Sequence, residues 1–274
     1  MKLSEMKQIL ASSDIRPTKS LGQNFLHDGN QLRRIVKAAE LQASDKVLEI
    51  GPGLGSLTDL LLETAGQVLA IEKDRRLVEF LQRRHAGVSD LILQHNDALE
   101  FLRRESRDWS DWKLVANLPY SVASPILVEL AQANGCPQRM VTTLQFEVAR
   151  RLIAKPGDDD YGLLTLLIQL RYEPAGWFKI RASCFFPAPD VDSACVTLIR
   201  RPEPVLNRKQ TVAFTRIVKR SFSQRRKMMF KLLKEDWPGE KLVVAFEKIE
   251  LLSQTRAETV SLDQFVHLTR MLCT

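Results

Sequence analysis

The stretch Lys46-Val-Leu-Glu-Ile-Gly-Pro-Gly-Leu-Gly-Ser56 decides the fold of this 274-residue chain. An apolar run leads into three glycines at alternate positions, and Leu57 to Leu62 has the pattern of a helix. A strand, a glycine turn and a helix in this order are typical of a nucleotide-type site, because glycine lets the backbone approach a ligand and the helix start presents free N–H groups to it. A glycine turn in some other α/β domain is the alternative at this point.

The spacing of the glycines bears on the ligand. A dinucleotide fingerprint needs a third glycine or alanine three residues after the second glycine. Here the glycines are Gly51, Gly53 and Gly55, position 56 is Ser, and Glu49 lies two residues before the first glycine. This pattern resembles the E-x-G-x-G-x-G motif of S-adenosylmethionine-dependent methyltransferases and differs from the NAD motif.

Length and composition indicate a globular protein of one large or two unequal domains. No apolar run approaches the roughly 18 residues that a membrane span needs, and the first seven residues lack the apolar core of a signal peptide, so we expect a cytoplasmic protein without a membrane partner. The cysteines and histidines lack the spacing of a zinc site, so we expect no metal.

Positive charge is concentrated in the last quarter of the chain. Residues 1–202 hold 26 basic and 25 acidic side chains, whereas residues 203–274 hold 14 and 8. Within the latter, the basic segment 207–234 contains ten Lys or Arg and no Asp or Glu. A block of one sign favours a polyanionic partner, and a basic surface without a partner is the alternative.

Strand-like and helix-like segments alternate up to about residue 200, which predicts a parallel α/β sheet. We expect residues 1–20 to form a loosely attached arm, 155–162 an exposed loop, and 163–170 either a helix or a strand. Beyond the linker at 200–204 the pattern becomes helical, with Ser223 predicted to cap one helix and Ser261 another. The predicted domains are therefore 1–202 and 203–274, the second small, all-helical and basic.

Polar residues follow successive predicted strands, where ligands of open α/β sheets bind. Glu72 follows the second strand, at a distance from Gly51 that suits a carboxylate accepting both ribose hydroxyls. Asp97 follows the third strand and could accept a hydrogen bond from an adenine amine. Each alone is commonly a turn residue or helix cap, and their joint placement favours a ligand role.

Asn117-Leu-Pro-Tyr120 follows the fourth strand and is the sharpest motif. The fixed φ of Pro119 points neighbouring carbonyls into the cleft. Methylation of an adenine amine needs such acceptors, because the N6 lone pair is delocalised and the amine must be oriented at the methyl donor. Tyr120 could stack on the base. A simple proline turn before a helix is the alternative.

Five ordered motifs together resemble the KsgA family of small-subunit ribosomal RNA adenine N6,N6-dimethyltransferases. The resemblance covers about residues 16–270 and implies a Rossmann-like class I methyltransferase fold with S-adenosylmethionine as cofactor. The motifs are Gly22-Gln-Asn-Phe-Leu26, Glu49 to Gly55, Asn117 to Tyr120, Phe185-Phe-Pro-Ala-Pro-Asp-Val-Asp-Ser193 and Ser223-Gln-Arg-Arg-Lys227.

The resemblance also implies roles for individual residues. Asn24 and Leu26 would contact the methionine part of the cofactor, and Gly51 would line its pocket. Glu72 would hold the ribose and Asp97 the adenine edge. Residues around the target adenine would be Asn117, between cofactor and N6, the Leu118 carbonyl and Pro119, which shape the amine site, and Tyr120 and Phe185, which sandwich the flipped base.

Three functions remain open from the sequence. The first is dimethylation of two adjacent adenines in a 3′-terminal hairpin of small-subunit (16S) ribosomal RNA during 30S subunit biogenesis, by a monomer acting on the immature particle. The second is a large-subunit rRNA adenine methyltransferase of the macrolide-resistance type. The third is an RNA-binding ribosome-assembly factor with dispensable catalysis.

Overall fold

The structure is a computed structural model that describes residues 1–13, 15–18, 21–105, 107–224 and 226–273. The chain divides into two compact units, one of residues 1–149 and 173–200 and the other of residues 150–172 and 201–274. The division at 202/203 drawn from the sequence stays a prediction. In the structure, residues 150–172 group with the C-terminal helices.

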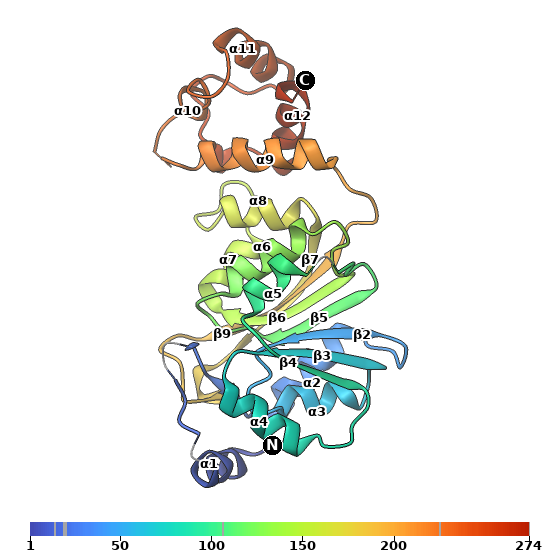
Figure 1. The fold of residues 1–274 in the computed structure, drawn as a ribbon. Helices are drawn as coiled ribbons and strands as arrows, with labels where there is room; N and C mark the ends of the chain where they lie inside the picture. The colour runs from blue at the N-terminus through green and yellow to red at the C-terminus, as the bar shows by residue number, and fades with distance from the viewer. Residues whose placement is uncertain (14, 19–20, 106, 225, 274) are drawn as a thin grey trace. The chain divides into compact units, whose positions relative to one another are not determined.

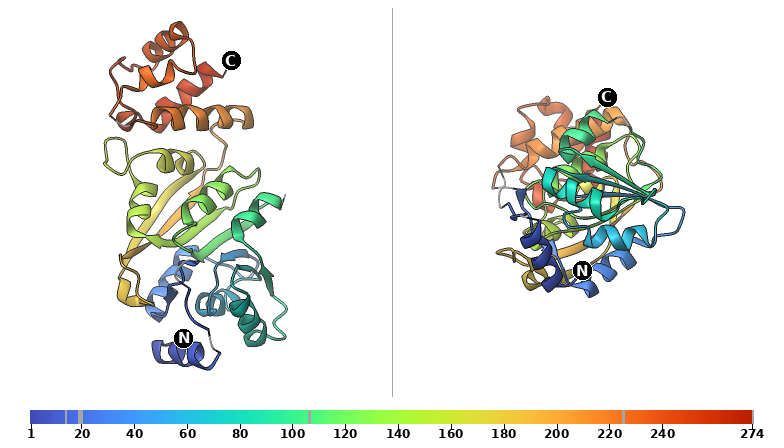
Figure 2. Two further views of the ribbon diagram at one scale, coloured as in Figure 1. Left: turned by 60° about the vertical axis from the view of Figure 1, so that its left-hand side comes forward. Right: turned by 60° about the horizontal axis from the view of Figure 1, so that its bottom comes forward.

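A seven-stranded sheet forms the centre of the first unit, in the order β4-β3-β2-β5-β6-β9-β7 (Figures 1 and 2). The first five strands in this order run parallel, and β9 runs antiparallel to β6. The strands are β2 (Lys46–Ile50), β3 (Gln67–Glu72), β4 (Leu91–His95), β5 (Trp112–Asn117), β6 (Arg139–Gln145), β7 (Tyr172–Ile180) and β9 (Ser193–Arg200).

The prediction of a parallel sheet is therefore wrong for β9. A parallel connection needs a crossover, usually a helix, long enough to return to the other end of the sheet. The segment between β7 and β9 holds only the short helix η2 (Ala182–Cys184) and the two-residue strand β8 (Phe185–Phe186). β8 pairs instead with β1 (Phe25–Leu26) in a separate antiparallel ribbon.

Helices cover both faces of the sheet: Figure 1 shows α2, α3 and α4 on one side and α5 and α6 on the other. Apolar residues of α2 and α3, such as Ile35 and Leu61, pack with Val47 and Val141 of the sheet in one buried cluster. The helices of this unit are α1 (Leu3–Ser12), α2 (Gly29–Ala39), α3 (Ser56–Leu62), α4 (Arg75–Arg84), α5 (Ala98–Arg104), α6 (Ala123–Gln132) and the start of α7 (Phe146–Ile153).

The second unit is helical. Phe214 of α9 and Phe265 of α12 meet edge to face in its core, with ring centroids 6.4 Å apart. Tyr161 is buried and donates a hydrogen bond to the Val260 carbonyl, so the expected exposed loop at 155–162 is wrong at this residue. Its helices are α8 (Leu163–Gln169), α9 (Arg208–Ser221), α10 (Met229–Leu233), α11 (Gly239–Lys248), η3 (Ala257–Thr259) and α12 (Leu262–Leu272).

One predicted helix cap is confirmed and the other is wrong. Ser261 and Gln264 form a reciprocal capping box at the start of α12. Ser223 instead donates its hydroxyl hydrogen bond to the Arg220 carbonyl, and the next helix begins only at Met229. Ser223 therefore follows the end of α9, where a hydroxyl can satisfy an unpaired helix carbonyl.

The N-terminal segment is a docked helix where the sequence predicted a loose arm. Met6 and Leu10 of α1 are buried in a cluster with Phe25, Leu54 and Leu77. Phe25 and Leu54 belong to two of the motifs, so α1 packs directly behind the candidate site. The apolar residues Leu3, Met6 and Leu10 recur at helical spacing, but the sequence does not show what they pack against.

Met6→Ala should detach α1, because truncating a buried Met removes about 2–5 kcal/mol of packing. We expect the backbone amides of residues 3–12 to exchange hydrogen at least about tenfold faster in this variant. Gln8→Ala, an exposed change on the same helix, is the control. Equal exchange in the two variants would show that the packing of Met6 does not hold the helix.

Candidate active site

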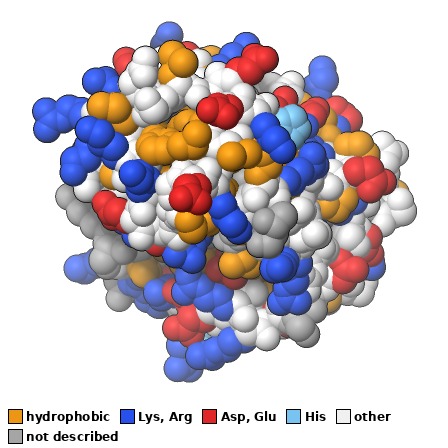
Figure 3. Space-filling view, turned by 90° about the horizontal axis from the view of Figure 1, so that it is seen from above, with side chains coloured by type: hydrophobic (Ala, Val, Ile, Leu, Met, Phe, Trp, Pro, Cys, Tyr) orange, Lys and Arg blue, Asp and Glu red, His pale blue; other side chains and the backbone are white. Residues whose placement is uncertain are grey.

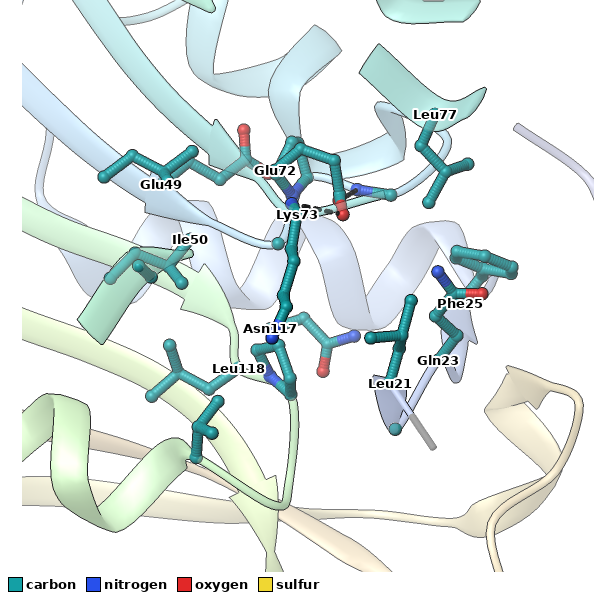
Figure 4. Close-up of a pocket in the computed structure, with 18 of the residues that line it drawn as sticks. Leu21, Gln23, Phe25, Glu49, Ile50, Glu72, Lys73, Leu77, Asn117 and Leu118 are labelled. Atoms are coloured by element: carbon teal, nitrogen blue, oxygen red, sulfur yellow. Dashed lines mark hydrogen bonds between the residues drawn. The ribbon is translucent and has the colours of Figure 1, made fainter. Parts of the chain in front are cut away.

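A cavity opens where strands β2, β3, β4 and β5 end (Figure 4). Its lining includes residues from each of these strand ends and from the segment before β1. The sequence-predicted residues that line it are Asn24, Leu26, Gly51, Glu72, Asp97, Asn117, Leu118, Pro119 and Tyr120.

The glycine loop passes close to two other motifs. Gly51 and Gly53 have φ of +69° and +61°, a left-handed conformation that L side chains rarely adopt. A Cβ on Gly53 would lie 2.8 Å from the Phe25 ring, and one on Gly51 would lie 3.2 Å from Pro119. The loop therefore needs glycine both for its backbone conformation and for the close approach of its neighbours.

Glu72 lies at the end of β3 with only 6% of its surface exposed. One carboxylate oxygen accepts the N–H groups of Lys73 and Asp74, and the other accepts the Gly53 N–H at 3.1 Å. Burial raises the pKa of Glu72, while these N–H donors oppose that rise by stabilising the charged form. The carboxylate is thus fixed in orientation against the glycine loop.

Asp97 serves as a helix cap and also faces the cavity. Its Oδ1 accepts the N–H groups of Leu99 and Glu100 at the start of α5, and its Oδ2 pairs with Lys73 at 2.8 Å. The hydrogen bond from Lys73 is the main cause that lowers the pKa of Asp97. From the sequence, a helix cap and a ligand contact were alternatives for Asp97, and its position in the structure allows both.

Asn117 connects the end of β5 with the segment before β1. Its Nδ2 donates a 3.1 Å hydrogen bond to the Asn24 carbonyl, which fixes the side-chain amide. Its Oδ1 is buried and has no hydrogen-bond partner among the residues that the structure describes. An unsatisfied buried acceptor costs about 1–3 kcal/mol, so a ligand N–H at this point would be stabilising.

The rest of the 117–120 motif is fixed by β6 and β9. The Leu118 N–H donates to the Thr143 carbonyl of β6 at 3.0 Å, and Pro119 packs against the glycine loop. Tyr120 Oη is 2.5 Å from Ser193 Oγ on β9, which anchors the phenol while the ring lines the cavity. Ser193 belongs to the fourth motif, so three motifs meet here.

Phe185 is the one predicted site residue that does not line the cavity. It is 3% exposed and packs in the core with Leu26 and Ile35. Its neighbour Phe186 is half-buried and lies 5.2 Å from the Lys7 ammonium of α1. A Phe185 ring that stacks on the target base has to leave this core position, and its stacking role stays a prediction.

The sequence argument missed several residues that line the cavity. Gln23 donates to Asp74 at 3.0 Å, and Lys73 pairs with Asp97. Ser56 Oγ is buried without a hydrogen-bond partner among the described residues. Glu49 was used only for the spacing of the glycine motif. Glu49, Ser56 and Lys73 could have been identified because each lies next to the glycine motif or to Glu72 in the sequence.

Glu49 is a strongly perturbed group of the cavity. Burial raises its pKa from the ordinary 4.5 to about 8, although the Thr58 hydroxyl donates a 2.7 Å hydrogen bond to it. At neutral pH this value favours the protonated form of the carboxyl group. A positively charged ligand beside it would favour ionisation.

Only part of the basic segment 207–234 offers free positive charge. Arg216 and Arg220 pair with Asp236, and Arg220 also pairs with Glu235. Figure 3 likewise shows acidic and apolar side chains among the basic ones on the face it draws. Arg226 and Lys227 of the fifth motif are exposed, whereas Arg225 lies outside the described residues.

The comparisons with known proteins decide the family. A family model described as "Ribosomal RNA adenine dimethylase" matches residues 15–273. The chain belongs to this family. Its members are S-adenosylmethionine-dependent methyltransferases, so the predicted fold class, enzyme class and cofactor are confirmed.

Full-length relatives and solved structures agree. "Ribosomal RNA small subunit methyltransferase A" of Protochlamydia amoebophila is 39% identical over 97% of this chain and 95% of its own length. A dimethyladenosine transferase of Plasmodium falciparum superposes with a TM-score of 0.76 at 25% identity, over 89% of this chain and 95% of that one. The 23S rRNA methyltransferase ErmE superposes with a TM-score of 0.70 at 28% identity, over 92% of this chain and 100% of that one.

Across the described ranges, no cluster of three or more His, Cys, Asp or Glu could hold a metal ion. None of the described helices has the length and hydropathy to cross a bilayer.

The raised pKa of Glu49 predicts a pH-dependent stability. Between about pH 4.5 and 8 the folded protein holds a proton on Glu49 that the unfolded chain has released, so stability should fall as pH rises through this window. Glu49→Gln should remove this dependence, and the midpoint of thermal unfolding should then change less from pH 5 to 8 than in the wild type. Glu63→Gln, at an exposed position, should behave as the wild type. If the midpoint of thermal unfolding depends on pH in the same way in wild type and Glu49→Gln, the raised pKa of Glu49 is contradicted.

Proposed function

We propose that this protein dimethylates N6 of two adjacent adenines near the 3′ end of small-subunit ribosomal RNA within the immature 30S particle. The observation that carries the chemistry is that Asn117 Oδ1, fixed by Asn24, is buried without a hydrogen-bond partner among the residues described. The substrate is proposed from the relatives named small subunit methyltransferase A.

The cavity residues fit S-adenosylmethionine, which supplies an electrophilic methyl group when bound. Glu72, with its carboxylate fixed by backbone N–H groups, would accept the ribose hydroxyls. Asp97 would face the adenine edge, and Asn24 and Leu26 would hold the methionine part beside Gly51. Glu49, once ionised next to the cationic ligand, would add electrostatic attraction.

At the target amine, orientation would be the main contribution to the rate. Asn117 Oδ1 and the Leu118 carbonyl would each accept one N–H of the adenine amine and hold the nitrogen toward the methyl donor. Such positioning can supply several kcal/mol or more of the barrier reduction. After the first transfer the amine keeps one N–H, so a single acceptor would orient the second.

The flipped adenine would lie against Tyr120, whose ring is anchored through Ser193. Stacking offsets the few kcal/mol lost when a base leaves its helix. Pro119 and the glycine loop would close the other side of the amine site. The exposed basic side chains of 207–234 would bind RNA phosphates. We expect a cytoplasmic monomer.

Asn117→Ala should abolish methyl transfer while the protein stays folded. Removing one preorganised polar contact of a reacting group costs about 100-fold or more in rate. The assay is incorporation of labelled methyl from S-adenosylmethionine into immature small subunits. Asn134→Ala, the same change at an exposed position, is the control. Wild-type protein that binds the cofactor but leaves this RNA unmodified would refute the proposal.

A large-subunit substrate is the second candidate, favoured by the likeness to ErmE. Purified small and large subunits, offered separately to the same wild-type protein, separate the two. Methyl incorporation into the large subunit alone would replace the first proposal with the second.

The basic segment should act through phosphate contacts. Each phosphate contact contributes about 0.7–0.9 to the slope of log K against log salt concentration. The double variant Arg226→Gln, Lys227→Gln should therefore reduce the slope for RNA binding by about 1.5, measured by filter binding at several salt concentrations. Lys248→Gln, at an exposed position of α11 outside the segment, should leave the slope unchanged. An unaltered slope in the double variant would exclude these side chains as phosphate contacts.

A further inference from the structure

Trp177 is an exposed tryptophan that the proposed mechanism does not use. It lies on β7, an edge strand of the seven-stranded sheet, and 48% of its surface is exposed. Single exposed apolar residues are common, but an exposed Trp within a cluster of other recognition side chains indicates a binding surface.

Trp177 belongs to such a cluster. Its ring centroid is 5.8 Å from that of Phe146, with the planes tilted by 48°. The Lys179 ammonium lies 5.2 Å from the Phe146 centroid and 2.8 Å from Asp192. Trp177 and Lys179 are two residues apart on a strand and so share a face. We call Phe146, Trp177 and Lys179 the β7 platform.

The β7 platform adjoins the residues that anchor the target-base site. Ser193, which contacts Tyr120 Oη, pairs in register with Gln145, the residue before Phe146. The Phe146 N–H donates to the Asp192 carbonyl at 3.0 Å. Phe146 therefore lies one residue along the same strand pair from the anchor of Tyr120.

We propose that the β7 platform stacks an unpaired nucleobase of the RNA substrate that flanks the target adenine. Aromatic side chains stack on any base, because every base has a π-face, and the charge of Lys179 beside them is balanced by Asp192. Glu147 and Glu173 are exposed close by in sequence, so this surface is unsuited to a phosphate cluster and suited to an uncharged base face. The proposal rests on the proposed function in that RNA is the substrate.

Binding of two RNA probes tests the proposal: a transcript of the 3′-terminal hairpin of small-subunit rRNA, and single-stranded oligoadenylate. Trp177→Ala should weaken binding of both by about 5- to 100-fold, and Trp177→Phe should stay within about threefold of wild type. Ile92→Ala, on the opposite edge strand β4 where Ile92 is 37% exposed, is the matched control. Calorimetric binding of S-adenosylmethionine should be the same in all four proteins.

Fluorescence supplies a readout that a merely structural role would not change. Trp109 and Trp112 are buried, so in a Trp237→Phe background Trp177 is the accessible tryptophan among the described residues. RNA should quench its emission, and adding Trp177→Phe should abolish the quenching while binding persists.

Several outcomes would overturn the proposal. Wild-type RNA affinity in Trp177→Ala would do so, as would quenching that survives Trp177→Phe. Loss of self-association in Trp177→Ala by sedimentation, with RNA binding intact, would show instead that the surface contacts a second copy. Methylation by the wild type on the same transcript keeps the two proposals apart. If the wild type methylates the transcript and Trp177→Ala binds RNA with normal affinity, only this inference fails. If the wild type does not methylate the transcript, the proposed function fails.

Discussion

The hydrogen bond from Asn117 Nδ2 to the Asn24 carbonyl connects the parts of the site that come from distant positions in the sequence. It links the end of β5 to the segment before β1, 93 residues apart. By engaging the amide nitrogen, it determines that Oδ1 is the atom left for a ligand. Phe25, the next residue after Asn24, has a ring that requires glycine at position 53 and packs in one cluster with α1. This hydrogen bond and the packing of Phe25 therefore connect the amine site with the glycine loop and with α1.

The two acidic groups behind the glycine loop differ although both are buried. Burial raises the pKa of both groups, but Glu72 receives three backbone N–H groups that oppose the rise, whereas Glu49 receives one hydroxyl and its pKa rises to about 8. The site thus combines an oriented carboxylate with a carboxyl group whose charge responds to its neighbour. Such a pair suits a cationic ligand with hydroxyl groups, because binding the cation also changes the protonation of the group beside it.

Much of the site could be predicted from sequence because its residues lie in short local motifs at strand ends. Gly51, Glu72, Asp97 and Asn117 each follow a strand, and a parallel sheet brings such ends together. What the sequence did not show depended on tertiary packing. The burial of Met6, the core position of Phe185 and the pairing of Arg220 with Asp236 are each decided by such packing. A motif identifies residue types and spacing but does not show which way a phenylalanine ring turns.

The direction of β9 explains how the fourth motif reaches the site. In an all-parallel sheet the carboxyl ends of the strands meet at the ligand edge, so residues at the start of a strand would lie at the far edge. Because β9 runs antiparallel to β6, its first residue, Ser193, pairs with Gln145 at the end of β6. The segment 185–193 is thereby delivered to the ligand edge, where Ser193 anchors Tyr120 and Asp192 holds Lys179. The departure from a parallel sheet is thus what places the segment 185–193 on the same edge as the cofactor residues.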